Sequence, residues 1–157
     1  MDGVRAYWDG SVLFSKQGKR LRVPEYFTKE FPSIPLDGEL WMGRASYDKL
    51  MVLLNSKDKE KEEWKSVGYY IFDLPASTAV GYEERLDQLQ QITLPSHVHI
   101  VESTKCHSME HLKQRLNEVL EGGGEGLVVH EPHSLYVPGF TSTLLKVKVF
   151  CIFMGTI

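Results

Sequence analysis

Residues 2–14 read DGVRAYWDGSVLF, and this stretch decides the fold of the chain. The runs Val4–Trp8 and Val12–Phe14 are rich in β-branched and aromatic residues, which favour strands. Asp9-Gly10 lies between them, and an Asp-Gly pair between two apolar runs is a strong hairpin signal. The sequence therefore predicts an antiparallel hairpin at the start of the chain, followed by a second turn at residues 16–19.

The rest of the chain alternates strand patterns with helical patterns. Further strands are predicted at 36–41, 69–75, 97–102, 126–130 and 144–150, and helices at 47–54, 82–92 and 109–120. Ser108 is a candidate N-cap for the last helix, and the glycines at 122–124 end it. Residues 57–65 carry mixed charge, which is typical of a solvated loop or helix face. We therefore expect an α+β fold with largely antiparallel sheets flanked by helices.

The composition is that of an ordinary globular domain. Of the 157 residues, 42% are hydrophobic and 25% are charged, which suits one compact domain, and we expect a monomer. No apolar run reaches the roughly 18 residues of a membrane span and no signal peptide opens the sequence, so no membrane partner is expected. Cys106 and Cys151 have no metal-ligand spacing, which favours a reducing, intracellular compartment, the nucleus if the organism is eukaryotic.

The net charge restricts how the chain could bind a nucleic acid. Affinity for a phosphate backbone comes from Lys and Arg, whereas the formal net charge here is −3. A basic surface must therefore be local, or lie on a part of the protein outside this sequence.

Five short motifs follow one another in a fixed order. They are Asp2-Gly3-Val4-Arg5, Leu36-Asp37-Gly38-Glu39-Leu40, Ile71-Phe72-Asp73-Leu74, Glu125-Gly126-Leu127-Val128-Val129 and Leu144-Leu145-Lys146-Val147-Lys148. The series resembles motifs I, III, IIIa, IV and V of the lysine-adenylating nucleotidyltransferases, which are DNA ligases, RNA ligases and mRNA capping enzymes. The stretches 2–10 and 36–41 look most like the minimal ATP-dependent DNA ligases of bacteria.

This resemblance implies a reaction, its cofactors and a partner. In the family a lysine attacks the α-phosphate of ATP, which gives a lysine–AMP amide and releases pyrophosphate. ATP and Mg²⁺ are therefore expected, and nicked duplex DNA is the expected partner, in DNA replication, repair and recombination.

Lys146 and Lys148 are the expected phosphate ligands and catalytic cations. They lie two residues apart on a predicted strand, so both side chains point to the same side. Two ammonium groups there would stabilise the charge of the transition state and lower the pKa of a neighbouring nucleophilic lysine. By resemblance, Asp2 orders the loop that carries the nucleophile and completes the expected catalytic set.

The resemblance also assigns the nucleotide contacts. Phe72 would stack on the adenine, Val128 would form the opposite wall of the adenine slot, and Arg5 would reach the ribose. Lys16 stands where relatives usually carry an arginine that contacts the nucleotide or the phosphate at the nick.

Glu39 and Glu125 are the expected carboxylates of the site. Mg²⁺ is held by one or two carboxylates together with phosphate oxygens, so few acidic ligands are needed. By resemblance, Glu125 helps to hold the metal, and Glu39 contacts the ribose or a metal-bound water. The six histidines show no metal-ligand arrangement, and none is assigned a role.

The sequence departs from the family pattern in three places. The family's first motif is Lys-x-Asp-Gly-x-Arg, and Met1 occupies the x position, so the nucleophilic lysine would fall one residue before the chain begins. Phe140 replaces an arginine that is typical of the minimal ligases. The OB-fold domain that follows motif V in ligases is not expected within these 157 residues, and one is expected in the full-length protein. We therefore expect a ligase-type nucleotidyltransferase (adenylation) domain at 1–150, incomplete at both ends, and a tail at 151–157 that matches nothing in the family.

Two alternatives stay open at the level of the sequence. One is an RNA ligase of the same superfamily, because no motif in this stretch separates RNA from DNA as the substrate. The other is a non-catalytic nucleotide-binding remnant, for which the missing lysine speaks.

Overall fold

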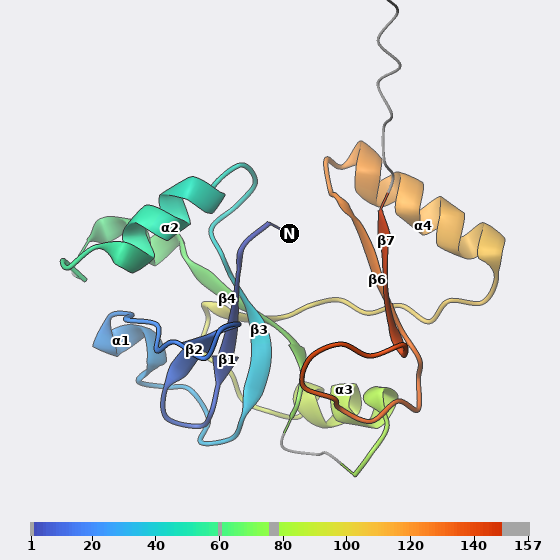
Figure 1. Ribbon diagram of the computed structural model, residues 1–157, viewed down its shortest axis with the longest axis horizontal. Helices are drawn as coiled ribbons and strands as arrows, with labels where there is room; N and C mark the ends of the chain where they lie inside the picture. The colour runs from blue at the N-terminus through green and yellow to red at the C-terminus, as the bar shows by residue number, and fades with distance from the viewer. Residues whose placement is uncertain (1, 60, 76–78, 149–157) are drawn as a thin grey trace, which may run out of the picture.

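The computed structural model describes residues 2–59, 61–75 and 79–148, and these form two β-sheets with helices around them (Figure 1). The strands are β1 (Val4–Trp8), β2 (Leu13–Ser15), β3 (Leu36–Trp41), β4 (Gly68–Asp73), β5 (Val98–Ile100), β6 (Gly126–His130) and β7 (Leu144–Lys148). The helices are α1 (Glu25–Thr28), α2 (Tyr47–Asn55), α3 (Tyr82–Gln90) and α4 (Met109–Glu121), with a 3-10 helix η1 (Glu62–Ser66). The predicted α+β fold is confirmed.

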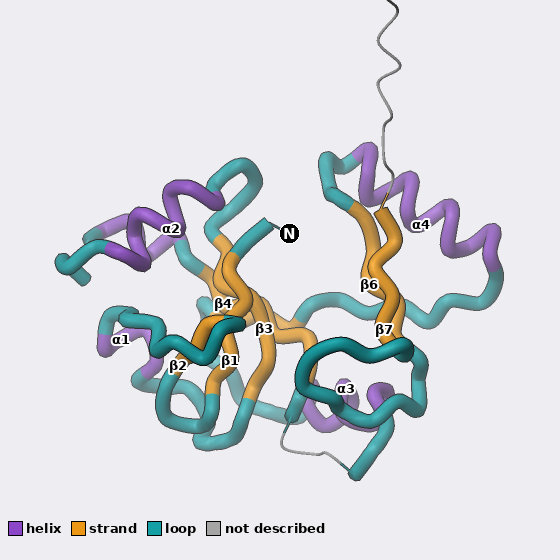
Figure 2. Tube along the Cα trace, viewed as in Figure 1, coloured by secondary structure: helices purple, strands orange, loops and turns teal. Residues whose placement is uncertain are grey.

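The larger sheet has the strand order β2-β1-β3-β4-β5, and the smaller one pairs β6 with β7. All pairings are antiparallel except that of β4 with β5. Figure 2 shows α1 and α2 on one side of the larger sheet and α4 beside the β6–β7 sheet. The two sheets stand opposite each other, with α3 near one end of the space between them (Figure 1).

Alternation along the strands divides the larger sheet into two faces. Residues that pair directly across neighbouring strands lie on the same face, which places Ala6 beside Gly38, and Arg5 beside Glu39. The face of Ala6 belongs to a core that includes Leu40 and Ile71, whose exposed fractions are zero. The face of Arg5 and Glu39 is turned to the smaller sheet. A period of two residues thus separates the residues that hold the fold from those that line the space between the sheets.

The close packing at Gly38 requires glycine. A Cβ there would lie 2.5 Å from the carbonyl oxygen of Tyr70 and 2.7 Å from the ring of Tyr69. That ring crosses the sheet, and its hydroxyl lies 2.9 Å from the carbonyl oxygen of Ala6 and 3.0 Å from that of Leu36. Asp37-Gly38 is therefore part of a strand interior and not a turn.

Most predicted elements are present, with two differences. The short helix α1 was not predicted, and it buries Phe27 in an aromatic cluster. The run 57–65 was predicted to be solvated, which is wrong for Trp64: η1 places this side chain in the core with 1% exposure. The N-cap role of Ser108 is confirmed, since its hydroxyl accepts a hydrogen bond from the His111 backbone N–H at 3.1 Å.

Two further predictions concern the end of the chain and membrane spans. The predicted strand end at 149–150 and the predicted tail at 151–157 lie outside the described residues. No helix in the described ranges is long and apolar enough to cross a bilayer.

Candidate functional site

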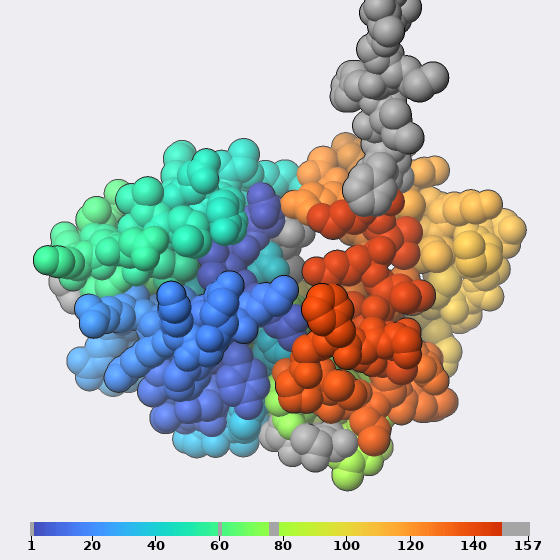
Figure 3. All heavy atoms as spheres, viewed as in Figure 1, coloured from blue at the N-terminus to red at the C-terminus, as the bar shows by residue number. Residues whose placement is uncertain are grey.

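A cleft of about 1960 Å³ lies between the larger sheet and the β6–β7 sheet. The space-filling view shows it as a hollow between the blue N-terminal strands and the red C-terminal strand (Figure 3). Sites for small ligands typically measure about 300–1,000 Å³, so this cleft has room for more than one such group. Arg5, Lys16, Glu39, Phe72, Val128 and Lys146 all line it.

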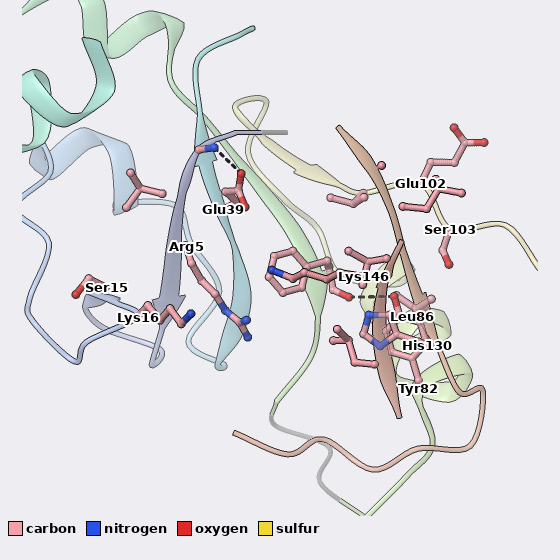
Figure 4. A pocket seen from close by; sticks show the side chains of 18 of the residues that line it. Arg5, Ser15, Lys16, Glu39, Tyr82, Leu86, Glu102, Ser103, His130 and Lys146 are labelled. Carbon is pink, nitrogen blue, oxygen red and sulfur yellow. Dashed lines mark hydrogen bonds between the residues drawn. The ribbon is translucent and has the colours of Figure 1, made fainter. Parts of the chain in front are cut away.

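The larger sheet contributes Arg5, Glu39 and Phe72 to the cleft. Figure 4 shows Arg5 and Glu39 pointing from β1 and β3 toward the smaller sheet. The Glu39 carboxylate accepts a hydrogen bond from the backbone N–H of Gly3 at 2.7 Å. Burial raises the pKa of Glu39, and the Gly3 hydrogen bond and the charge of Lys146 partly oppose this rise. Glu39 thus ties the chain just before β1 to β3, and Lys146 is close enough to act on its charge.

Arg5 is held by a buried carboxylate that the motif comparison did not single out. Its Nε donates to Asp37 at 3.1 Å and its Nη2 forms an ion pair with the same group, while the hydroxyl of Tyr136 donates to Asp37 at 2.8 Å. Asp37 is only 1% exposed. The Arg5 guanidinium also lies 5.2 Å from the ring centre of Phe72. Asp37 therefore fixes the direction of Arg5 beside the expected adenine-stacking ring.

The smaller sheet supplies the opposite wall. Val128 pairs with Lys146 and Gly126 with Lys148, so all four belong to one face of the β6–β7 ribbon. Val128 is 53% exposed. The same-face prediction for Lys146 and Lys148 is confirmed by this register. Lys146 lines the cleft opposite the larger sheet (Figure 4).

Lys148 has a partner of its own. Its ammonium group lies 2.5 Å from the Glu125 carboxylate, and both side chains are about half exposed. The hydrogen bond from Lys148 lowers the pKa of Glu125, and the same hydrogen bond raises the pKa of Lys148. Lys148, which is expected to bind phosphate, thus neutralises the charge of Glu125, which is expected to bind metal.

The structure adds Tyr82 and His130 to the cleft. Their rings stack with centres 3.9 Å apart and planes at 9°, and the Tyr82 hydroxyl donates to the Phe72 carbonyl oxygen at 3.4 Å. His130 lies two residues beyond Val128 on the same face of β6. Burial lowers the pKa of His130. His130 thus packs on Tyr82, whose hydroxyl is hydrogen-bonded to the backbone of Phe72.

A buried ion pair holds the end of β4. Arg85 on α3 binds Asp73 through Nε at 2.6 Å and Nη2 at 3.1 Å, and its Nη1 donates to the carbonyl oxygens of Val80 and Ser134 at 2.8 and 2.9 Å. Arg85 is 1% exposed. Asp73, which follows Phe72 in the motif, is thereby explained as an anchor for the strand and not as a cleft residue.

Asp2 and Lys16 lie toward the edges of this arrangement. Asp2 is exposed two residues before β1, and Lys16 is exposed in the turn after β2, where it lines the cleft. Within the described ranges no cluster of three or more His, Cys, Asp or Glu side chains could hold a metal ion. Glu39 and Glu125 fit the weaker requirement of Mg²⁺, which takes most of its ligands from phosphate and water.

Comparison with known proteins identifies similar chains. Residues 12–148 match the family model of the ATP dependent DNA ligase domain. A DNA ligase of Haemophilus influenzae (strain ATCC 51907 / DSM 11121 / KW20 / Rd) is 34% identical over 151 residues, which cover 94% of this chain and 55% of the relative. The chain therefore spans little more than half the length of this relative.

Solved structures give the same picture. One from a structure–function analysis of DNA binding by Lig E DNA ligases is 30% identical with a TM-score of 0.86, over 95% of this chain and 59% of that one. The Chlorella virus DNA ligase–adenylate has a TM-score of 0.78 at 22% identity, over 94% of this chain and 58% of that one, and it shares the fold. The bacteriophage T7 ligase in complex with ATP has a TM-score of 0.68 at 19% identity, over 94% of this chain and 60% of that one.

Proposed function

The chain belongs to the ATP-dependent DNA ligase family, and on that premise we propose that it binds ATP with Mg²⁺ and performs adenylyl transfer for the sealing of nicked duplex DNA. One observation carries this proposal. Arg5, Glu39, Phe72, Val128 and Lys146 come from separate motifs and line one cleft. The relatives described above are DNA ligases, which favours DNA over RNA as the substrate.

The adenine would lie between the two sheets. Phe72 offers an aromatic face from β4, and Val128 offers an exposed apolar side chain from β6. Stacking on an aromatic ring suits a flat base. The stacked rings of Tyr82 and His130 would support this slot, since the Tyr82 hydroxyl donates a hydrogen bond to the Phe72 carbonyl oxygen.

The sugar and the phosphates would lie toward the charged residues. Arg5 is aimed by Asp37 and is the expected ribose contact, together with Glu39. Lys146 and Lys148 would surround the α-phosphate and stabilise the charge that grows on it. Asp2, just before β1, would order the loop of the nucleophile.

Mg²⁺ would neutralise part of the negative charge on the phosphate oxygens of ATP. Glu125 and Glu39 are the residues that would hold it. Glu125 would have to leave its ion pair with Lys148 or share it, and this is inexpensive because exposed ion pairs contribute only about 0–1 kcal/mol.

The covalent step would follow the family's chemistry. The lysine nitrogen bonds to the α-phosphorus of ATP and loses its proton, while the bond from that phosphorus to pyrophosphate breaks. That lysine is the first residue of the pattern Lys-x-Asp-Gly-x-Arg, which places it immediately before Met1.

Two measurements test the proposal. Calorimetry with ATP and Mg²⁺ should detect binding to the 157-residue chain, and Phe72→Ala should weaken it, whereas an equal affinity for Phe72→Ala and the parent would remove Phe72 from the adenine slot. Incubation with α-labelled ATP should label a chain that carries a lysine directly before Met1, and not the chain without it. Covalent label on the unextended chain, including the acid-labile, base-stable label of a lysine–AMP phosphoramidate, would overturn the assignment of the nucleophile.

A further inference from the structure

The loop between β6 and β7 is held in place by helix α3, beside which it passes (Figure 1). The carbonyl oxygen of Pro132 accepts a hydrogen bond from the Glu83 N–H at 3.0 Å, in the first turn of α3, where no side chain caps the helix. A Cβ at Gly81 would lie 2.9 Å from the Cα of His133, so only glycine lets the loop come this close. The start of this loop therefore has a fixed position on α3.

The next residues of the loop point alternately inward and outward, as in an extended strand. Ser134 is 9% exposed, and its carbonyl oxygen accepts a hydrogen bond from Arg85 at 2.9 Å. Leu135 and Val137 are about half exposed, whereas Tyr136 between them turns inward toward β3. The contacts with α3 thus determine where the Tyr136 hydroxyl lies.

That hydroxyl holds the carboxylate of Asp37 from one side while Arg5 holds it from the other. Tyr136 donates to Oδ2 at 2.8 Å, Arg5 donates to the same oxygen through Nη2, and Arg5 Nε donates to Oδ1 at 3.1 Å. Burial, and then the charge of Asp37, raise the pKa of Tyr136, so its hydroxyl keeps the proton that it donates. The carboxylate therefore cannot turn without breaking one of these bonds.

Arg5 keeps donors for a ligand. Its guanidinium is planar and carries five N–H groups, and the side-on pairing with Asp37 uses only Nε and Nη2. Among the described residues no group accepts a hydrogen bond from Nη1. Arg5 lines the cleft and its guanidinium lies 5.2 Å from the ring centre of Phe72. Nη1 can therefore donate to a sugar that is attached to a base stacked on that ring.

We propose that Tyr136 is a positioning residue for recognition of the ribose: through Asp37 it fixes the direction in which Arg5 donates to the 2′-hydroxyl group of ATP. This inference rests on the proposed function, in which Arg5 is the expected ribose contact. Tyr136 and Asp37 lie behind the cleft wall and do not line it, so neither touches the nucleotide. The loop that joins the strands of one wall thus controls a contact made by the opposite wall.

The test compares ATP with 2′-deoxy-ATP, which lacks only the hydroxyl in question. Calorimetry with Mg²⁺ gives the Kd of each nucleotide, at a temperature where every variant is folded by circular dichroism. The measured quantity is the ratio of the Kd for 2′-deoxy-ATP to the Kd for ATP. A general loss of stability weakens both nucleotides alike and leaves this ratio unchanged, so the ratio separates positioning from a purely structural role.

The matched control is Tyr82→Phe. It also removes one tyrosine hydroxyl, but that hydroxyl donates to the carbonyl oxygen of Phe72 at 3.4 Å and not to Asp37. Arg5→Lys removes the planar fork while it keeps a positive charge beside Asp37. The double variant of Arg5→Lys and Tyr136→Phe shows whether the two residues act on one contact.

The parent should prefer ATP, because a site built to donate to a hydroxyl discriminates against a ligand that lacks it. Tyr136→Phe should lower the ratio by about 3-fold or more, within the range of coupling between residues of one hydrogen-bonded network. Tyr82→Phe should weaken both nucleotides equally. Arg5→Lys should bring the ratio close to one, and the addition of Tyr136→Phe should not change it further.

The other outcomes overturn the inference in distinct ways. If Tyr136→Phe weakens both nucleotides by the same factor while Arg5→Lys lowers the ratio, Tyr136 serves only the fold. If Tyr136→Phe still changes the ratio in the Arg5→Lys background, it does not act through Arg5. If the parent binds both nucleotides equally, Arg5 does not contact the 2′-hydroxyl, although ATP binding and the proposed function stand. Failure of the parent to bind ATP would count against the proposed function itself.

Discussion

Removal of the Tyr136 hydroxyl should loosen both the fold and the nucleotide site. In the parent this hydroxyl donates to the buried Asp37 carboxylate at 2.8 Å, and Asp37 in turn aims Arg5. A hydrogen bond to a charged group contributes about 1.5–3 kcal/mol to stability. For a chain of this length each kcal/mol corresponds to about 2–4 °C in Tm, so Tyr136→Phe should lower Tm by about 3–12 °C.

The assay is thermal unfolding followed by circular dichroism, together with calorimetric ATP binding at a temperature where both proteins are folded. Tyr47→Phe is the matched control for the unfolding temperature only, because Tyr47 is 41% exposed on α2 but lines the cleft. ATP affinity should fall in Tyr136→Phe, since Arg5 shares Asp37 with Tyr136. A second variant, Asp37→Asn, should not add its full effect to Tyr136→Phe, because the two changes remove the same contact. If Tyr136→Phe and Tyr47→Phe unfold at the same temperature, the buried network does not stabilise the cleft and this reasoning fails.

Two other perturbations test the opposite wall of the cleft. In a complete protein with the nucleophilic lysine, Lys146→Ala or Lys148→Ala should slow adenylation by about 10²–10³ in single-turnover assays, with much smaller changes in ATP affinity. Glu125→Ala should raise the Mg²⁺ concentration that adenylation requires. The control variant Lys113→Ala should leave the adenylation rate unchanged. Burial lowers the pKa of His130 in the folded chain, so the unfolded chain binds a proton more readily and the stability that neutral His130 allows is lost as the pH falls below about 6.5. His130→Gln should therefore show a smaller decrease of Tm between pH 7.5 and 5.5 than the parent, and an equal decrease in both would show that His130 does not contribute.

The strands of the larger sheet were predictable from their residue pattern, whereas the roles of Arg5, Glu39 and Phe72 were implied by the resemblance of their motifs to the family. These three residues lie on the face of the sheet that is turned away from the core, and that face forms one wall of the cleft. Helix α4 was predictable from its N-cap, Ser108. Helix α1 was not predictable, because its four residues are too few to show a helical period. The burial of Phe27 stabilises this short helix.

The partners within the site were not predictable, because each joins residues that are far apart in the chain. Asp37 and Tyr136 are 99 positions apart, and Arg85 reaches the carbonyl oxygen of Ser134 across 49. No local pattern marks Tyr136 as the donor to a buried carboxylate. Asp37 was expected on a strand with acidic residues at alternate positions, but its burial and its arginine partner follow only from the pairing of that strand with β1.

The loop between β6 and β7 explains how the cleft keeps its shape with so few contacts between the sheets. Tyr136 binds Asp37, Ser134 accepts from Arg85, and the Glu83 backbone N–H donates to Pro132 at 3.0 Å. These three contacts tie the loop to β3 and α3 at one end of the cleft. Arg44, in the loop after β3, donates to the Gly123 carbonyl oxygen, beyond the end of α4. This contact joins the two sides of the cleft through the turn that leads into β6.

The two ends differ in what it would take to open them. Asp37 is buried, so loss of its donors would leave a carboxylate without compensation, which costs several kcal/mol. Arg44 is exposed and donates to a single carbonyl, so its contact contributes far less than a buried pair. Movement that admits a substrate should therefore occur at the Arg44–Gly123 end, which is also where the Lys148–Glu125 pair lies half exposed on the strands that follow the turn. Lys148 and Glu125, which are proposed to meet phosphate and metal, thus lie near the end that is held by an exposed contact, while buried contacts hold the end near Asp37.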